Sequence, residues 1–194
     1  MERELTILGI SGSLREGSYN TATLRAAQEL CPPGARIEMF TELGAIPAFN
    51  QDLENDPPAA VRELKRQIRE ADAILFVTPE YNYSVPGVLK NAIDWASRPY
   101  GDNAWDGKPA AIMGASTGMF GSARAQYHLR QMFVFLNMLA VNQPEVTIPM
   151  AAERFDDLGD LTDDMSRKLI AELLENLVTW TRRLSPQREL AGVV

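Results

Sequence analysis

The sequence predicts an α/β fold, in which helices cover both faces of one parallel β-sheet. Two observations predict it. Short apolar runs typical of strands alternate five times with amphipathic segments typical of helices. Some of these runs, such as residues 73–78, are apolar at nearly every position, as expected for parallel strands buried on both faces. With 194 residues, 45% of them hydrophobic and 23% charged, the chain fits one domain around a single well-buried core.

The first half of the chain supplies two strands and two helices. The apolar run at 5–10 predicts the first strand, and a polar loop separates it from a helix over about 19–30. A second strand is expected at 36–40. A connection rich in Pro, Asn and Asp then leads to a helix over 59–70, whose apolar positions fall on one stripe facing the sheet: Val61, Leu64, Lys65 and Ile68.

The second half continues the alternation. Strands are expected at 73–78, 109–115 and 146–148, with helices over about 86–98, 122–139 and 162–184. Pro86 suits the first residue of its helix, because a proline there costs no helical hydrogen bond, and Pro99 ends that helix. We expect one domain over residues 1–185 and a C-terminal tail over 186–194.

Right-handed crossovers around a central first strand give the strand order 2-1-3-4-5, a flavodoxin-like three-layer sandwich. In such sheets the ligand crevice lies where the connections diverge, outside the carboxyl ends of strands one and three. The loops that follow the strands are therefore the places to search for a site.

The charge balance excludes several partners. The formal net charge is -7, and a nucleic acid or an anionic membrane would require a clustered basic surface instead. The first residues show no signal-peptide pattern, and the apolar stretch at 132–141 is short and interrupted by Asn137. We therefore expect a cytoplasmic protein.

Thiol and metal chemistry are also not expected. Cys31 is the only cysteine, which excludes a disulfide framework and a cysteine metal cluster. The only histidine, His128, lies in a helical run with no evident link to Cys31. We interpret Cys31 as a structural thiol and predict no metal site.

Residues 79–87, Pro-Glu-Tyr-Asn-Tyr-Ser-Val-Pro-Gly, directly follow a buried strand. A turn with two tyrosines, an asparagine and a serine at the carboxyl end of a parallel strand is a candidate ring-binding loop. The loop after strand four, 114–121, contributes further hydroxyls at Ser116 and Thr117.

The loop after the first strand is suited to a phosphate. It combines a glycine-flexed turn, serines and Arg15 immediately before a helix, and free amides at a helix N-terminus attract anions. It lacks the lysine of the nucleoside-triphosphate loop and the three spaced glycines of the dinucleotide fingerprint, so a monophosphate fits best. The alternative is that Ser18 only caps the helix and 11–13 only form a turn.

Three motifs carry a family resemblance. They are Gly12-Ser13-Leu14-Arg15-x-x-Ser18-x-Asn20, then Pro79-Glu80-Tyr81-Asn82-x-Ser84-x-Pro86-Gly87-x-Leu89-Lys90-Asn91-Ala92-Ile93-Asp94-Trp95, then Gly121-x-x-Arg124-Ala125-Gln126 with Leu129-Arg130. Over residues 5 to about 149 the chain resembles the NADPH-dependent FMN reductase family, and within it the bacterial quinone and chromate reductases, with azoreductases as nearby relatives. Ser122 departs from the pattern, because the family usually has a second glycine there.

The resemblance implies FMN as cofactor and NADPH or NADH as co-substrate, with a hydride passing to quinones or to chromate, azo compounds or free flavin. The alternative is a flavodoxin-type electron carrier. No side chain is expected to be catalytic, because the flavin carries the chemistry. The expected cofactor-binding residues are Ser11, Ser13, Leu14, Arg15, Ser18, Tyr19, Asn20, Pro79, Glu80, Tyr81, Asn82, Ser84, Ser116 and Thr117.

Tyr83 and Arg124 are candidates for contact with the nicotinamide or the acceptor, and Arg124 or Arg98 for the 2′-phosphate of NADPH. The helices at 86–95 and 122–139 carry more apolar bulk than one sheet face should need, which indicates a subunit interface. The resemblance likewise implies a homodimer or a dimer of dimers.

Overall fold

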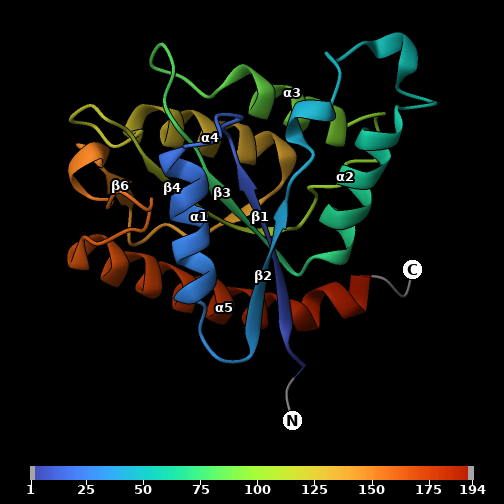
Figure 1. The fold of residues 1–194 in the computed structure, drawn as a ribbon. Coiled ribbons are helices and arrows are strands. Elements are labelled where there is room, and N and C mark those ends of the chain that lie inside the picture. Colours follow the sequence, from blue (N-terminus) through green and yellow to red (C-terminus); the bar gives the residue numbers. More distant parts are fainter. Residues whose placement is uncertain (1–2, 192–194) are drawn as a thin grey trace.

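A computed structural model describes residues 3–191, which form a single parallel sheet between two layers of helices (Figure 1). The strand order β2-β1-β3-β4-β5, with β6 also paired to β4, confirms the predicted order 2-1-3-4-5. The strands are β1 Leu5–Ser11, β2 Ala35–Phe40, β3 Ala73–Val77, β4 Pro109–Ala115, β5 Leu139–Ala140 and β6 Val146–Ile148.

The fifth strand position is divided between two short strands. β5 pairs with Pro109 and Ala110 at the start of β4, whereas β6 pairs with its last three residues. The expected helix over 122–139 is thus too long at its C-terminus. It ends at Leu136, because Asn137 adopts φ +55°, and a residue in the left-handed region ends a helix.

Over the described residues the α-helices are α1 Tyr19–Glu29, α2 Ala59–Glu70, α3 Gly87–Ala96, α4 Ala123–Leu136 and α5 Asp164–Ala191. The first four connect strands, and α5 follows the last strand. Short 3-10 turns occupy Leu43–Ala45, Gln51–Leu53 and Ala151–Glu153. Pro86 lies one residue before α3 rather than inside it. α5 continues past the expected end at 184, so part of the expected tail is helical, and residues 192–194 lie outside the described residues.

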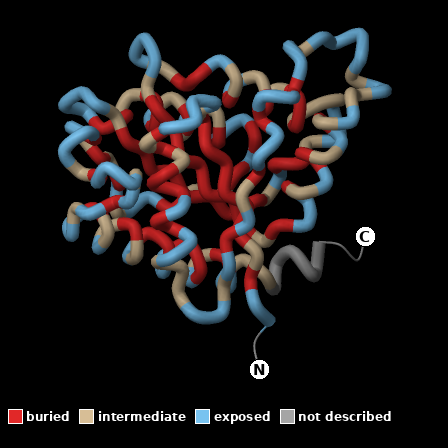
Figure 2. Tube along the Cα trace, viewed as in Figure 1, coloured by how far each residue is buried: buried red, intermediate tan, exposed pale blue. Residues whose placement is uncertain are grey.

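The central strands β1, β3 and β4 divide their side chains between two cores, because successive residues of a strand point to opposite faces. On β1, Leu5 and Ile7 pack with α1 and α5, whereas Leu8 and Ile10 pack with α2, α3 and α4. β3 and β4 alternate in the same way. Figure 2 shows the buried residues concentrated along the strands, between the two helix layers.

The helices differ in how completely their apolar residues are buried. The stripe predicted on α2, which contains Val61 and Lys65, is buried as expected. Trp95 of α3 is 1% exposed and meets Phe49 edge-on, so the bulk of α3 is used in the core. On α4, by contrast, Val134 and Phe135 are 83% and 77% exposed. The excess apolar surface therefore lies on α4 rather than on both helices.

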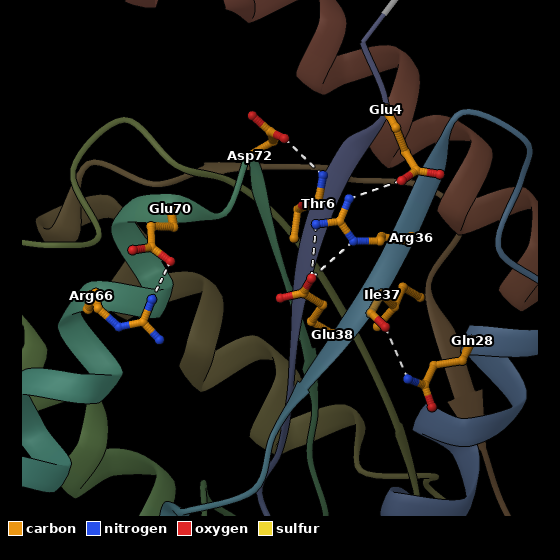
Figure 3. Close-up of polar contacts among 9 residues, drawn as sticks. All are labelled: Glu4, Thr6, Gln28, Arg36, Ile37, Glu38, Arg66, Glu70 and Asp72. Carbon is orange, nitrogen blue, oxygen red and sulfur yellow. Dashed lines mark hydrogen bonds and ion pairs between the residues drawn. The ribbon is translucent and has the colours of Figure 1, made fainter.

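Polar contacts tie β1 to its neighbours away from the carboxyl ends (Figure 3). A carboxylate oxygen of Asp72 accepts a hydrogen bond from the backbone N–H of Thr6 at 2.8 Å, and Arg36 pairs with Glu4 and Glu38 at 2.9 Å each. The Arg36 pairs are about half exposed, so they contribute little to stability. Across residues 3–191, no helix has the length and apolar character needed to span a membrane.

Candidate functional site

The carboxyl ends of β1, β3 and β4 open into one cavity of about 180 Å³. The loops that follow these three strands surround it, as the sheet order requires. Its lining consists of Ser13, Arg15, Ser18, Tyr19, Asn20, Pro79, Glu80, Tyr81, Ala115, Ser116 and Thr117.

Two hollows of about 310 Å³ each lie elsewhere, beside β5 and α5, and share Ala140, Asn142 and Trp180. β5 pairs with the first residues of β4, so these hollows lie toward the end of the sheet opposite the loops. They are larger, but ligands of parallel α/β sheets bind at the carboxyl ends of the strands. The three-loop cavity is therefore the candidate site.

The loop after β1 places a helix N-terminus at the cavity. The Ser18 hydroxyl accepts hydrogen bonds from the N–H groups of Asn20 and Thr21 at 3.2 and 3.3 Å, so it caps α1. Ser13 and Arg15 stand in the same loop, and Arg15 is exposed. The Arg15 guanidinium carbon lies 5.5 Å from the centre of the Tyr19 ring. Ser18 therefore caps the helix, and the exposed Arg15 in the same loop can bind an anion.

Asn20 links this loop to β4. Its side-chain amide donates to the carbonyl of Ala115 at 3.0 Å, and its oxygen accepts from the N–H of Ala115 at 2.9 Å. Both bonds are buried, and Asn20 is 3% exposed. Asn20 therefore fixes the spacing between two walls of the cavity, and its amide oxygen is used in that contact.

The loop after β3 forms a tight two-residue turn. Tyr81 and Ser84 exchange two backbone hydrogen bonds of 3.0 Å, and the residues between them, Asn82 and Tyr83, have φ of +50° and +65°. Two consecutive positive φ values are those of a type I′ turn. The Ser84 hydroxyl is also 2.9 Å from Nδ1 of His128 on α4. The turn holds Tyr81 at the cavity while Asn82 and Tyr83 form its tip.

Glu80 joins the same loop to the N-terminus of α4. One carboxylate oxygen accepts from the backbone N–H groups of Arg124 and Ala125 at 2.9 and 3.3 Å, and the other pairs with Nη1 of Arg124 at 2.8 Å. A carboxylate at a helix N-terminus is stabilised by the free N–H groups there. Glu80 is thus a capping and pairing residue, and its carboxylate is already occupied.

Gly114, near the end of β4, packs closely against residues of the neighbouring loops. A Cβ at Gly114 would lie 2.1 Å from the Ser122 hydroxyl and 2.2 Å from the Thr78 carbonyl, so only glycine fits. Ser122, where the family usually has glycine, does adopt φ +70°. Its hydroxyl accepts a 3.2 Å hydrogen bond from Gln126. The serine is accommodated in a conformation that glycine adopts more easily.

Most of the predicted cofactor-binding residues lie around the cavity, but four do not line it: Ser11, Leu14, Asn82 and Ser84. Ser11 instead bonds Thr21 at 2.9 Å, and Leu14 is 55% exposed. Sequence reasoning missed Ala115, which lines the cavity at the end of β4. The sequence did indicate it, because Ala115 is the last residue of the predicted strand 109–115, and ligands bind at the carboxyl ends of such strands.

The lining suits a phosphorylated ligand with a flat ring. Arg15, Ser13 and the first amides of α1 offer charge-assisted and neutral donors to a phosphate. Pro79 and Tyr81 offer an apolar edge and an aromatic face on the other wall. The residues present therefore fit FMN, which carries both a monophosphate and a planar ring.

Comparison with known proteins places the chain in a class of flavin-dependent reductases. Residues 5–153 match the family of NADPH-dependent FMN reductases. The solved structure of FerB, a flavoenzyme NAD(P)H:(acceptor) oxidoreductase from Paracoccus denitrificans, superposes with a TM-score of 0.84. It is 38% identical, and the match covers 92% of this chain and 98% of FerB.

Two curated relatives are similar over nearly their whole length. The NAD(P)H-dependent FMN reductase PA1204 of Pseudomonas aeruginosa is 55% identical over 95% of this chain and 99% of its own. The 2-hydroxy-1,4-benzoquinone reductase of a Burkholderia species is 42% identical over 92% and 97%, respectively. The chain belongs to the NADPH-dependent FMN reductase family, with FMN as its cofactor.

Proposed function

We propose that the chain reduces quinones with a hydride taken from NADPH or NADH, using FMN held in the three-loop cavity. The observation that carries this proposal is that the N-terminus of α1, with Arg15 beside it, and the turn that carries Tyr81 line one cavity at the edge of the sheet. FMN, when bound, supplies the hydride chemistry. The chain supplies binding and orientation, and no side chain of its own is proposed to be catalytic.

The lining residues divide between two ends of the ligand. Ser13, Arg15 and the α1 amides hold the phosphate, whereas the 79–82 segment lies along the ring and Ser116 and Thr117 close the opposite side. Ser18 and Asn20 act by positioning the α1 start against β4. Ser84 acts by holding the turn to α4 through His128.

Quinones are proposed as acceptors because the Burkholderia relative is named for a benzoquinone. Chromate, azo compounds and free flavin are further candidate acceptors, since an open ring face admits many electrophiles. The relatives are named as reductases, which does not favour the electron-carrier alternative.

We propose that the protein is cytoplasmic and that each subunit is a single domain. The two cores share one sheet, which supports a single domain that includes α5. We propose a homodimer or a dimer of dimers in which the exposed face of α4, with Val134 and Phe135, contacts another subunit.

The test is a pair of half-reactions. The protein is loaded with FMN and mixed in a stopped-flow instrument with NADPH or NADH, and then with a quinone. The proposal predicts bleaching of the flavin absorbance by the nicotinamide and its rapid return with the quinone. A colourless protein that takes up no added FMN, or a flavin that neither nicotinamide reduces, would contradict it.

A further inference from the structure

Arg124 contacts two aromatic rings and pairs with Glu80, one of the residues that line the cavity. Its guanidinium carbon is 4.0 Å from the centre of the Tyr83 ring and 3.9 Å from that of Phe120. The two rings come from the loops after β3 and β4, so Arg124 joins two walls of the cavity. Two such cation–π contacts restrict the position of the guanidinium, and its N–H groups can still donate hydrogen bonds.

Arg124 keeps hydrogen-bonding capacity despite its ion pair with Glu80. Over the described part of the chain, Nη1 is the only side-chain nitrogen of Arg124 that donates a hydrogen bond. The Glu80 charge is shared, because its other oxygen accepts from the backbone N–H groups at the start of α4. The side chain of Arg124 is 32% exposed, whereas that of Glu80 is 10% exposed. The accessible partner of the pair is thus the cation.

The turn beside Arg124 is held in a costly conformation. Tyr83 has φ +65°, a strained backbone conformation that is rare for a bulky aromatic residue. Such strain persists only where surrounding contacts enforce it, and it concentrates at functional sites. Here the Arg124 stack and the Ser84 contact with His128 hold the turn onto α4. The placement of Tyr83 over Arg124 is accordingly enforced.

The other arginine that the sequence offers for a 2′-phosphate lies elsewhere. Arg98 follows the end of α3, where its carbonyl is bonded by the Lys65 ammonium and its guanidinium stacks on Tyr100 at 4.0 Å. α3 begins directly after the 79–87 loop and runs back toward the opposite end of the sheet. At its end, the carbonyl of Ala96 accepts a hydrogen bond from the N–H of Ala104, which lies shortly before the first residue of β4. Arg98 is therefore at the opposite end of the sheet from the cavity.

We propose that Arg124 selects the phosphorylated nicotinamide by contacting the 2′-phosphate of NADPH, with Tyr83 and Phe120 holding its guanidinium in place. This inference rests on the proposed function. In a chain of net charge -7, a polyanionic co-substrate needs a local cation at the site entrance. Arg15 lines the cavity and is assigned to the FMN phosphate, whereas Arg124 lies beside the cavity, paired with the lining residue Glu80.

The test compares both nicotinamides with FMN-loaded protein. A charge-assisted contact of about 1.5–3 kcal/mol corresponds to about a 10- to 100-fold change. Arg124→Gln should therefore lower kcat/KM for NADPH about 10- to 100-fold more than for NADH. Arg124→Lys, which keeps a charge without the planar fork, should fall between Arg124→Gln and the wild type. Arg98→Gln is the matched control and should keep the wild-type ratio.

A binding measurement adds a readout that does not depend on turnover. In a calorimetric titration, adenosine 2′,5′-bisphosphate should bind the wild-type protein with a lower Kd than AMP, and Arg124→Gln should remove that difference. Equal losses for NADPH and NADH, or an unchanged ratio in both Arg124 variants, would overturn the inference while leaving the proposed function standing. If neither nicotinamide reduces the wild-type flavin, the proposed function itself fails.

Discussion

Asn20 provides the most quantitative test of how the cavity is built. Replacing it with alanine removes two buried hydrogen bonds to Ala115, of 2.9 and 3.0 Å, and leaves the N–H of Ala115 without that partner. Losing buried bonds of this kind costs about 1–3 kcal/mol each, so the free energy of unfolding should fall by about 3 kcal/mol. For a chain of this size that lowers Tm by about 6–12 °C.

The assay is thermal and urea unfolding of Asn20→Ala with and without FMN. The deficit should be present without FMN, because the contact lies within the protein. Ser13→Ala is the matched comparison: Ser13 makes a 3.4 Å exposed bond to Arg15, so its loss should weaken FMN binding with little change in stability. A wild-type Tm for FMN-free Asn20→Ala would refute the view that Asn20 positions the cavity walls.

Three further predictions concern charge and reactivity. Arg15→Ala should weaken FMN affinity about 10- to 100-fold by removing a charge-assisted phosphate contact; fluorescence titration checks this, and unchanged affinity contradicts it. Burial, aided by Glu4, raises the pKa of the Cys31 thiol, so thiol reagents should react slowly at pH 7 and Cys31→Ser should keep wild-type turnover. Burial acts to raise the pKa of Asp102, but Lys65 and other cationic contacts hold it below its usual value. Asp102→Asn should therefore lower Tm by up to about 4 °C at pH 7 and by less near pH 3; an equal deficit at both pH values contradicts this.

The sign of the Asp102 effect follows from the direction of its shift. A lowered pKa in the folded state means that ionised Asp102 stabilises the fold above its unfolded pKa of about 3.9. This stabilisation is lost as the pH falls through the lower, folded pKa. The Asp102 side chain is about half exposed whereas that of Lys65 is 5% exposed, so the loss of stability in Asp102→Asn should be modest.

The fold could be predicted from the sequence because strands such as β3 and β4 are apolar at nearly every position and alternate with amphipathic helices such as α2. The α2 stripe containing Val61 and Ile68 is buried as expected. The divided fifth strand was not predicted, because β5 has only two residues and follows directly from the apolar run of α4. Only the left-handed conformation of Asn137 separates the two elements.

The general position of the site was predictable for the same reason, since loops after neighbouring parallel strands must meet. What sequence spacing could not supply is which polar groups face the cavity and which face each other. The amide of Asn20 bonds Ala115, 95 residues away, and Glu80 caps a helix 44 residues downstream. Such pairings depend on the packed arrangement of loops, which motif spacing does not encode.

The central claim is that FMN occupies the cavity between the loops after β1, β3 and β4. The most direct measurement is a crystal structure of the protein with FMN bound. We expect the phosphate of FMN to lie against Arg15 and the first amides of α1, with the ring along residues 79–82. FMN bound instead beside Trp180 in the hollow near β5 and α5, or a phosphate remote from Arg15, would contradict it.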